Sequence, residues 1–578
     1  MSDSPCWILG ISALYHDSAA ALLRDGEVVA AVQEERFTRI KHDASLPLRA
    51  SAWCLEQAGI TVDDLTHVVF YEKPLRKLER MVVSQVLTFP RSLKAFRIGA
   101  LNHLGDRLWV GSRICKDLEI PADKLLFCEH HLSHAASAFY GSGESEAAVL
   151  VADGVGEWAT TSIWRGGPDG LEPVSEIRFP HSLGLAYSAF TAFLGFRVNN
   201  GEYKVMGMAP YGQPRFVDEV RQVIDTVEGG GFAVDLDRVT WHHSATDSYG
   251  PGFEALFGEP RHPDEPLDFS TPEGRRWADI AASIQHVTES LLLDLVEAAH
   301  ESTGLDALCM AGGVALNSVA NTHIATRGPF ARVHVHPAAG DAGGAIGAAW
   351  WAWREVVKGE GCGTLRPDLG PTVDESDTQA LLDDLHVAWQ RLDDDVLIDT
   401  VAEDLAAGRV VGWVQGGAEW GPRALGFRSI LADPRGPAQR DRVNATIKFR
   451  EAFRPFAPST PAELLSDRFT APPAAASLLP WMLAVVPVAD TAREKLGAVT
   501  HVDGSARVQA VSAEVNPRFH ALLHAFGEKT GTPVLLNTSF NLKGEPIVNS
   551  AVQAIATFDR SGLDVLVMGN LRIEKSAR

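Results

Sequence analysis

Hydrophobic and polar positions near the start of the chain alternate in a pattern that predicts a β-hairpin. The apolar run 19–23 ends at Asp25-Gly26, and a second apolar run follows at 28–32. Asp-Gly between two apolar runs is a strong short-range turn signal. A similar pattern returns at 147–152 and 159–164, again around an Asp-Gly pair. Because each hairpin is followed by helical sequence, the repetition predicts a duplicated α/β fold.

Longer patterns predict helices and a strand that ends in glycine. Apolar residues follow helical spacing at 48–58 and 274–303. The apolar run 307–311 then leads into Gly312-Gly313. Two glycines after a strand let the backbone approach a ligand closely. The actin-like ATPase fold has the same duplicated plan, and there a loop of this kind would hold a nucleotide.

Glycine, proline and charged residues gather at 355–375, which we take as a domain boundary. The pattern predicts an N-terminal domain at 1–360 and a second domain at 376–578. The second domain is expected to begin with a helix that reaches about Gly408 and a strand at 410–414. At 578 residues the chain is too long for a single hydrophobic core, which also favours two domains.

Composition excludes several classes of protein. Hydrophobic content of 46% and charged content of 22% are typical of a soluble globular protein. A formal charge of −22 argues against nonspecific binding to nucleic acid or to an anionic membrane. The six cysteines form no C-x-x-C pair, so no thiolate zinc site or disulfide framework is predicted. With no signal-peptide pattern and no membrane-spanning run, we predict a cytoplasmic protein.

Histidines and carboxylates predict a metal site. His130 and His134 are four residues apart, which places both imidazoles on one face of a helix. Asp153 ends the apolar run 147–152, and Asp341 lies in a glycine-rich stretch. Imidazole nitrogen with carboxylate oxygen suits iron, zinc or manganese. The alternative is two histidines that only pack on a helix, but the pair follows the end of an apolar strand, where sites form in α/β sheets.

A basic stretch in the second domain predicts an anion-binding site. Residues 421–454 contain eight Arg or Lys and three acids, a local charge of 8 − 3 = +5. The basic residues alternate with apolar ones, which argues against a purely solvated surface. Arginine binds phosphate through paired hydrogen bonds, so a phosphorylated ligand is favoured.

Eight segments, in order along nearly the whole chain, resemble the O-carbamoyltransferases of nodulation-factor and antibiotic biosynthesis. Each is modest alone, but together they are highly specific. The segments are 15–20 (YHDSAA), 34–39 (EERFTR), 130–137 (HHLSHAAS), 204–207 (KVMG), 312–317 (GGVALN), 420–426 (WGPRALG), 454–458 (RPFAP) and 536–541 (LNTSFN).

The resemblance implies an actin-like N-terminal domain, similar to the tRNA threonylcarbamoyl-transferring enzymes, and a YrdC-like α/β C-terminal domain. Carbamoyl phosphate and ATP would react in the C-terminal domain to give a carbamoyl-adenylate. The N-terminal domain would then transfer the carbamoyl group to an acceptor hydroxyl near a bound iron. The acceptor would be a small natural product or sugar, and the oligomeric state stays open, with a homodimer among the options.

The resemblance also assigns roles to individual residues. It implies that His16 is the general base for the acceptor hydroxyl, because an imidazole with a near-neutral pKa suits that task. Lys41 matches a lysine at a phosphate-binding position. The implied metal ligands are His130, His134, Asp153 and Asp341. The implied contacts to ATP and carbamoyl phosphate are Arg423, Lys448, Arg454, Arg507, Asn537 and Ser539, to which the strand-to-glycine pattern adds Gly312 and Gly313 as nucleotide contacts.

The sequence departs from the antibiotic-type enzymes in segment 195–204, and His181 is not shared by all members, so the acceptor stays open.

Three other hypotheses remain. An actin-like sugar kinase or ATPase would explain the hairpins but not the histidine pair. A tRNA threonylcarbamoyl-type enzyme fits the metal motif but not the charge of −22. A nucleotide or metal sensor would have the same folds without turnover.

Overall fold

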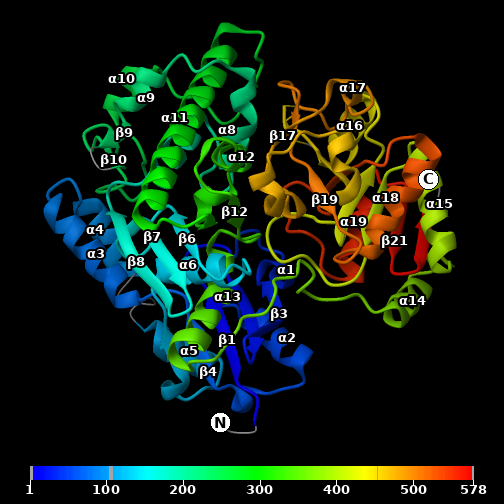
Figure 1. The fold of residues 1–578 in the computed structure, drawn as a ribbon, viewed down its shortest axis with the longest axis horizontal. Coiled ribbons are helices and arrows are strands. Elements are labelled where there is room, and N and C mark those ends of the chain that lie inside the picture. The colour runs from blue at the N-terminus through cyan, green and yellow to red at the C-terminus, as the bar shows by residue number, and fades with distance from the viewer. Residues whose placement is uncertain (1–3, 103–108, 228–229, 449, 452, 576–578) are drawn as a thin grey trace. The chain divides into compact units, whose positions relative to one another are not determined.

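The computed structural model describes residues 4–102, 109–227, 230–448, 450–451 and 453–575 (Figure 1). The chain forms two compact units. Unit 1 consists of Met1–Val29 and Ala44–Thr364, and unit 2 of Ala30–Asp43 and Leu365–Arg578. Residues 30–43, which the sequence interpretation places in the N-terminal domain, therefore group with unit 2.

Segment 30–43 is held in unit 2 by hydrogen bonds to distant backbone. Ala31 N donates to Leu369 O at 3.1 Å. The Arg36 guanidinium donates to Gly421 O at 2.9 Å, and that of Arg39 donates to Pro546 O and Ile547 O, each at 2.7 Å. Buried carbonyl groups need such donors, so this segment helps to fix the two loops that contain residues 421 and 546–547.

The first sheet of unit 1 contains the predicted hairpin. Asp25 and Gly26 have φ of 50° and 87°, the left-handed backbone that this tight turn requires. The strand order is β3-β2-β1-β4-β5, with β1 antiparallel to β2 and parallel to β4. The strands are β1 (Trp7–Ser12), β2 (Ala19–Arg24), β3 (Glu27–Gln33), β4 (His67–Phe70) and β5 (Leu125–Phe127).

The second sheet of unit 1 repeats this plan, with the order β8-β7-β6-β11-β12. Here β6 is antiparallel to β7 and parallel to β11, as β1 is to β2 and β4. The predicted duplication is confirmed, and unit 1 has the actin-like arrangement. The strands are β6 (Ala147–Ala152), β7 (Ala159–Gly167), β8 (Gly170–Arg178), β11 (Ala307–Ala311) and β12 (Arg332–Val335).

Two buried helices, α6 (His130–Tyr140) and α13 (Asp341–Trp351), link the sheets. They contact each other, while α13 packs on β1 and β2 and α6 packs on β6 and β11 (Figure 1). Their close approach requires glycine, because a Cβ at Gly347 would lie 1.8 Å from Ser133 O. Helices α2 (Leu48–Ala58) and α11 (Pro272–Thr303) contact β2 and β6, as their apolar spacing predicts.

Unit 2 is built on a mixed eight-stranded sheet, in the order β13-β22-β21-β14-β15-β20-β16-β19. The predicted strand at 410–414 is β14 (Val411–Val414). Helices α15 (Asp394–Ala406) and α18 (Pro517–Thr530) pack against each other, and the buried core beside them contains Trp413 and Phe519. The other main elements are β15 (Arg428–Ala432), β16 (Ala457–Pro461), β19 (Gln509–Val511), α18 (Pro517–Thr530), β20 (Leu535–Ser539), α19 (Ala551–Arg560), β21 (Val565–Met568) and β22 (Leu571–Glu574).

The single helix predicted from 376 to about 408 is wrong. The structure has two helices, α14 (Glu375–Asp384) and α15 (Asp394–Ala406), with the short strand β13 (Gln390–Arg391) between them. His386 has a left-handed φ of 54°, which ends helical geometry, and β13 pairs with β22. That pairing is a long-range contact and leaves no helical signal in the local sequence. Among the described residues, no helix is both long and apolar enough to cross a membrane.

Candidate metal centre and anion site

The four predicted metal ligands converge in unit 1. His130 and His134 lie on the first turns of α6, Asp341 begins α13, and Asp153 follows β6. One ligand atom from each lies within 4.8 Å of the others. His130 Nε2 is 3.0 Å from Asp153 Oδ2, and His134 Nε2 is 3.7 Å from Asp341 Oδ1. The pairing of α6 with α13 therefore creates the cluster.

Neighbouring groups orient these ligands. Asp153 Oδ1 accepts a hydrogen bond from Gly313 N at 2.9 Å, which directs the other carboxylate oxygen toward the histidines. Tyr71 Oη donates to Asp341 Oδ2 at 3.2 Å. The Glu157 carboxylate accepts from His130 N at 3.0 Å and so caps α6. Such outer partners fix ligand geometry. Sequence reasoning missed Tyr71 and Glu157, because no local motif marks either residue.

The donor set fits a divalent transition metal. The side chains of His130, His134 and Asp341 are at most 3% exposed. Among the described residues, the buried Nε2 of His134 has no hydrogen-bond partner. Burial alone would lower the pKa of His130. The carboxylates of Asp153 and Asp341 outweigh this effect and raise the pKa to about 9. Two carboxylates, one buried and one partly buried, face two buried imidazoles, which is the arrangement that a cation would stabilise.

We expect metal analysis of the purified chain to find about one iron-like ion, lost in His130→Ala and in His134→Ala. Each substitution removes one of the four converging ligand atoms. Elemental analysis of matched preparations measures the content. His262→Ala is the control, because His262 is 73% exposed and lies 3.7 Å from Asp264, outside the cluster. Full occupancy in the His130, His134 double variant would contradict the assignment.

His16 lies near this cluster, in the turn between β1 and β2. Its Nδ1 is 3.0 Å from Asp17 Oδ2. Burial alone would lower the pKa of His16. The carboxylates of Asp341, Asp17 and Asp153 outweigh this effect and raise the pKa to about 9. A cation held by Asp153 and Asp341 would offset these negative charges and lower the pKa of His16 toward neutrality, where imidazole acts as a base.

The two glycines predicted to contact nucleotide, Gly312 and Gly313, also have roles in the fold itself. Gly312 has a φ of 93°, and a Cβ there would lie 2.2 Å from Ala152 O. Gly313 N holds Asp153, as described above. The pair thus shapes the metal centre, and its contact with nucleotide stays a prediction.

The basic stretch of unit 2 separates into two groups. Four of its arginines bind carbonyl or carboxylate groups and lie outside the cluster of cations described below. Arg428 is fully buried and donates to backbone carbonyls, including Gln415 O and Pro371 O. The other three form ion pairs: Arg435 with Asp433, Arg440 with Asp441 and Arg442 with Asp564. Half of the basic stretch is therefore engaged within the fold, by backbone carbonyls at Arg428 and by carboxylates at the other three arginines.

The remaining cations gather around Lys448 and Arg507. Burial lowers the pKa of Lys448 well below its usual value, and the charges of Arg450, Arg454 and Lys41 lower it further. Burial and the charges of Arg423, Arg450 and Arg454 do the same to Arg507. We call Lys41, Arg423, Lys448, Arg454 and Arg507 the cationic cluster. Like charges this close repel one another, and a bound polyanion would stabilise them.

Lys448 is oriented by neutral acceptors. Its ammonium donates to Asn541 Oδ1 at 2.8 Å and to Ser539 Oγ at 3.3 Å. The amide of Asn537 donates to Ser459 Oγ and Gln509 Oε1, and its buried Oδ1 has no partner among the described residues. Ser539 therefore lies beside Lys448, whereas the Asn537 amide group also holds neighbouring strands together.

Glu419, which sequence reasoning missed, organises the loop that contains Arg423. One oxygen of this buried carboxylate accepts hydrogen bonds from the backbone N–H groups of Leu425, Phe427 and Arg428 at 2.8–2.9 Å. Three donors on one oxygen define the loop geometry. The residue directly precedes the quoted 420–426 segment, which is the signal that could have revealed it.

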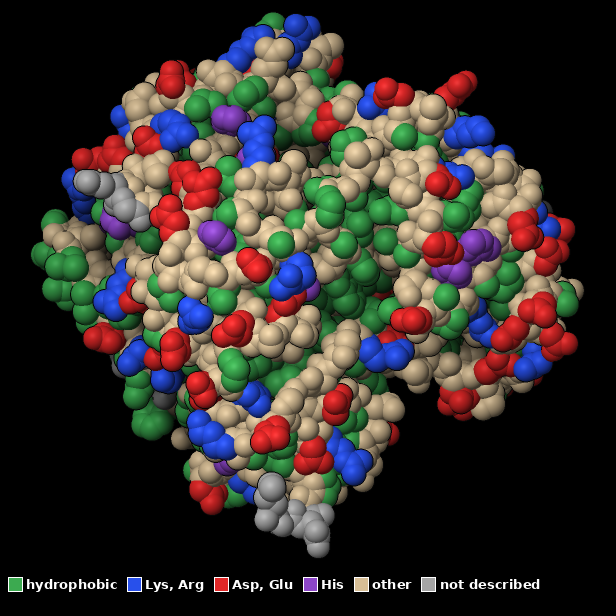
Figure 2. Space-filling view, viewed as in Figure 1, with side chains coloured by type: hydrophobic (Ala, Val, Ile, Leu, Met, Phe, Trp, Pro, Cys, Tyr) green, Lys and Arg blue, Asp and Glu red, His purple; other side chains and the backbone are tan. Residues whose placement is uncertain are grey.

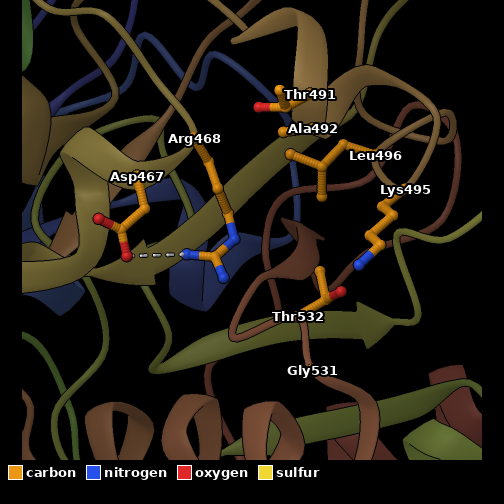
Figure 3. Close-up of a pocket in the computed structure, with 8 residues that line it drawn as sticks. All are labelled: Asp467, Arg468, Thr491, Ala492, Lys495, Leu496, Gly531 and Thr532. Carbon is orange, nitrogen blue, oxygen red and sulfur yellow. Dashed lines mark ion pairs between the residues drawn. The ribbon is translucent and has the colours of Figure 1, made fainter.

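A separate pocket in unit 2 is unrelated to the predicted contacts. Figure 3 shows the side chains of Arg468 and Lys495 on opposite sides of it. Arg468 Nη1 lies 3.6 Å from Asp467 Oδ2. None of the predicted contact residues lines it. The lining residues are Asp467, Arg468, Thr491, Ala492, Lys495, Leu496, Gly531 and Thr532.

Comparison with known families identifies the family to which the chain belongs. Residues 7–350 match the model for the carbamoyltransferase N-terminus, and residues 402–575 match that for the carbamoyltransferase C-terminus. The chain belongs to the carbamoyltransferase family. The predicted resemblance is confirmed, and as a carbamoyltransferase the protein is an enzyme of mixed α/β fold.

Several relatives of this carbamoyltransferase span most of the chain. Protein sll1178 of Synechocystis is 45% identical over 99% of this chain and 97% of its own. Nodulation protein NolNO of Sinorhizobium fredii is 39% identical over 97% of this chain and 79% of its own. A further relative, the 3'-hydroxymethylcephem-O-carbamoyltransferase of Amycolatopsis lactamdurans, is 38% identical over 50% of this chain and 53% of its own. Among solved structures, HypF of T. kodakarensis is 13% identical, with a TM-score of 0.31 over 61% of this chain and 48% of its own.

Proposed function

We propose that the protein is an O-carbamoyltransferase that uses carbamoyl phosphate and ATP, forms a carbamoyl-adenylate, and passes the carbamoyl group to a hydroxyl of a small molecule. The observation that carries this proposal is the presence of two chemically different sites in one family member. Unit 1 has a buried histidine–carboxylate centre, and unit 2 has a buried cationic cluster.

The cationic cluster supports the first half-reaction. Joining ATP and a carbamoyl group brings several negative charges together. Arg454, Arg507 and Lys448 are already held close to one another before ligand arrives. Donors that are fixed in advance need little reorganisation as charge develops, so they stabilise the transition state. We therefore assign adenylate formation to unit 2, and a YrdC-like topology for this unit stays a prediction.

The centre in unit 1 supports the second half-reaction. His130, His134, Asp153 and Asp341 would hold the metal, for which iron is our candidate. When bound, the metal would bind phosphate and polarise the carbamoyl carbonyl. A hydroxyl is a weak nucleophile until a base removes its proton, and His16 is the base that we propose.

The acceptor is proposed to lie near Tyr15, which is 42% exposed beside His16. The side chain of Asn199, in the divergent segment 195–204, lies close to Tyr15. Residue differences in that segment would therefore change the surroundings of the acceptor hydroxyl. His181 accepts a hydrogen bond from Val234 N at 3.1 Å, so we give it a structural role.

Product analysis tests the proposal. With ATP, carbamoyl phosphate and a panel of hydroxylated natural products and sugars, we expect AMP, pyrophosphate, inorganic phosphate and a carbamoylated product. Isotopic label in the carbamoyl group identifies the acceptor. Release of ADP with phosphorylation of a sugar would instead favour an actin-like kinase. Absence of turnover with every acceptor, combined with tight nucleotide binding, would favour a sensor.

A further inference from the structure

Unit 2 has a second group of metal-type ligands, outside the sites described above. His520 and His524 are four residues apart on α18, and their ring centroids are 4.6 Å apart. Glu463 lies in the short helical segment Ala462–Asp467 that directly follows β16. The side chains are 17%, 41% and 52% exposed, respectively. Figure 2 shows histidine side chains in purple gathered beside acidic ones near α18.

Both imidazoles direct the same nitrogen to one carboxylate oxygen. His520 Nε2 and His524 Nε2 each lie 2.8 Å from Glu463 Oε1. Ligands bound to zinc at about 2.0–2.2 Å in a tetrahedron are separated by roughly 3.3 Å. The carboxylate oxygen therefore needs to lie only about half an ångström farther from each histidine nitrogen to make room for an ion, and the half-exposed Glu463 side chain can make that change.

The scaffold holds the histidines in this geometry. α18 is capped by Asn516, whose side chain accepts from Phe519 N at 3.2 Å. Phe519 and Phe526, on the same helix, are fully buried in the core, so α18 cannot rotate freely. Its i, i+4 spacing then keeps both rings on one face. α18 also packs on β16, which leads directly to Glu463.

The donors select a class of ion. Two imidazoles and one carboxylate suit Zn²⁺, Co²⁺, Ni²⁺ or Cu²⁺, whereas Mg²⁺ and Ca²⁺ prefer oxygen alone. Glu463 is half exposed, and a carboxylate in contact with water is ionised at neutral pH. Exposure leaves the remaining coordination positions open to water.

We propose that Glu463, His520 and His524 form a surface binding site for a zinc-class divalent cation, which links α18 to the end of β16. This site is separate from the carbamoyl-transfer centres and does not rest on the proposed function. A bound ion would stabilise unit 2, because a ligand that binds only the folded chain favours folding.

Zinc binding to the full-length chain tests the proposal. The chain is stripped with a chelator, dialysed against Zn²⁺ and analysed for metal. We expect the wild type to bind about one zinc more per chain than the His520→Ala, His524→Ala double variant. His262→Ala, which removes an exposed histidine with only one acidic neighbour, should bind as much as the wild type.

Two further measurements keep the test independent of folding defects. Glu463→Gln retains the size of the side chain and should weaken binding of the additional zinc about tenfold or more. Zinc should raise the unfolding temperature of the wild type and of His262→Ala, but less so that of the double variant. Equal zinc content in wild type and double variant, or unchanged affinity in Glu463→Gln, would overturn the site.

Discussion

Replacement of His16 by asparagine is expected to slow carbamoyl transfer by about 10²–10⁴-fold while carbamoyl-adenylate formation continues. His16 lies in unit 1, near Asp153 and Asp341, whereas the cationic cluster belongs to unit 2. Asparagine keeps a polar group of similar size beside Asp17 but cannot accept a proton at neutral pH. The substitution should therefore separate the two half-reactions.

Pyrophosphate release and carbamoylated product are measured on one preparation of His16→Asn. His262→Asn serves as the matched control, since it exchanges an exposed histidine of the same unit. If both half-reactions slow together, His16 is structural or acts in the first step. If neither slows, the base is a different residue.

Replacement of Arg454 by alanine is expected to slow adenylate formation by about 10²–10³-fold. Arg454 contributes positive charge to the surroundings of both Lys448 and Arg507, and loss of one donor weakens the stabilisation of developing negative charge. The fold should survive. Arg454 lies 3.5 Å from Glu451, and the relief of repulsion within the cluster offsets the loss of this ion pair. Without ligand, the variant should unfold at the wild-type temperature or slightly above it.

The control for Arg454→Ala comes from the same basic stretch. Arg440 forms an ion pair with Asp441 at 3.0 Å, so Arg440→Ala should leave pyrophosphate release nearly unchanged. ATP should raise the unfolding temperature of the wild type and of Arg440→Ala more than that of Arg454→Ala. Pyrophosphate release near the wild-type rate in Arg454→Ala would show that this arginine does not contact the reacting phosphates.

Features that depend on neighbouring residues could be predicted from the sequence. The turn at Asp25-Gly26 requires a left-handed backbone, and the helix at 48–58 follows from apolar spacing. The same local logic places His130 and His134 on one helical face. The eight short segments also identify the family, because their order along the chain does not depend on coordinates.

Only the tertiary structure decided which charges meet. Asp153 and Asp341 reach the histidines because α6 and α13 pair between two sheets, and glycine at 347 permits that approach. Sequence could not separate Arg442, which pairs with Asp564, from Arg454 in the cationic cluster. Nor could it place segment 30–43 in unit 2. Charges and backbone partners far apart in the chain become neighbours only through packing, so a local pattern gives the type of side chain but not its partner.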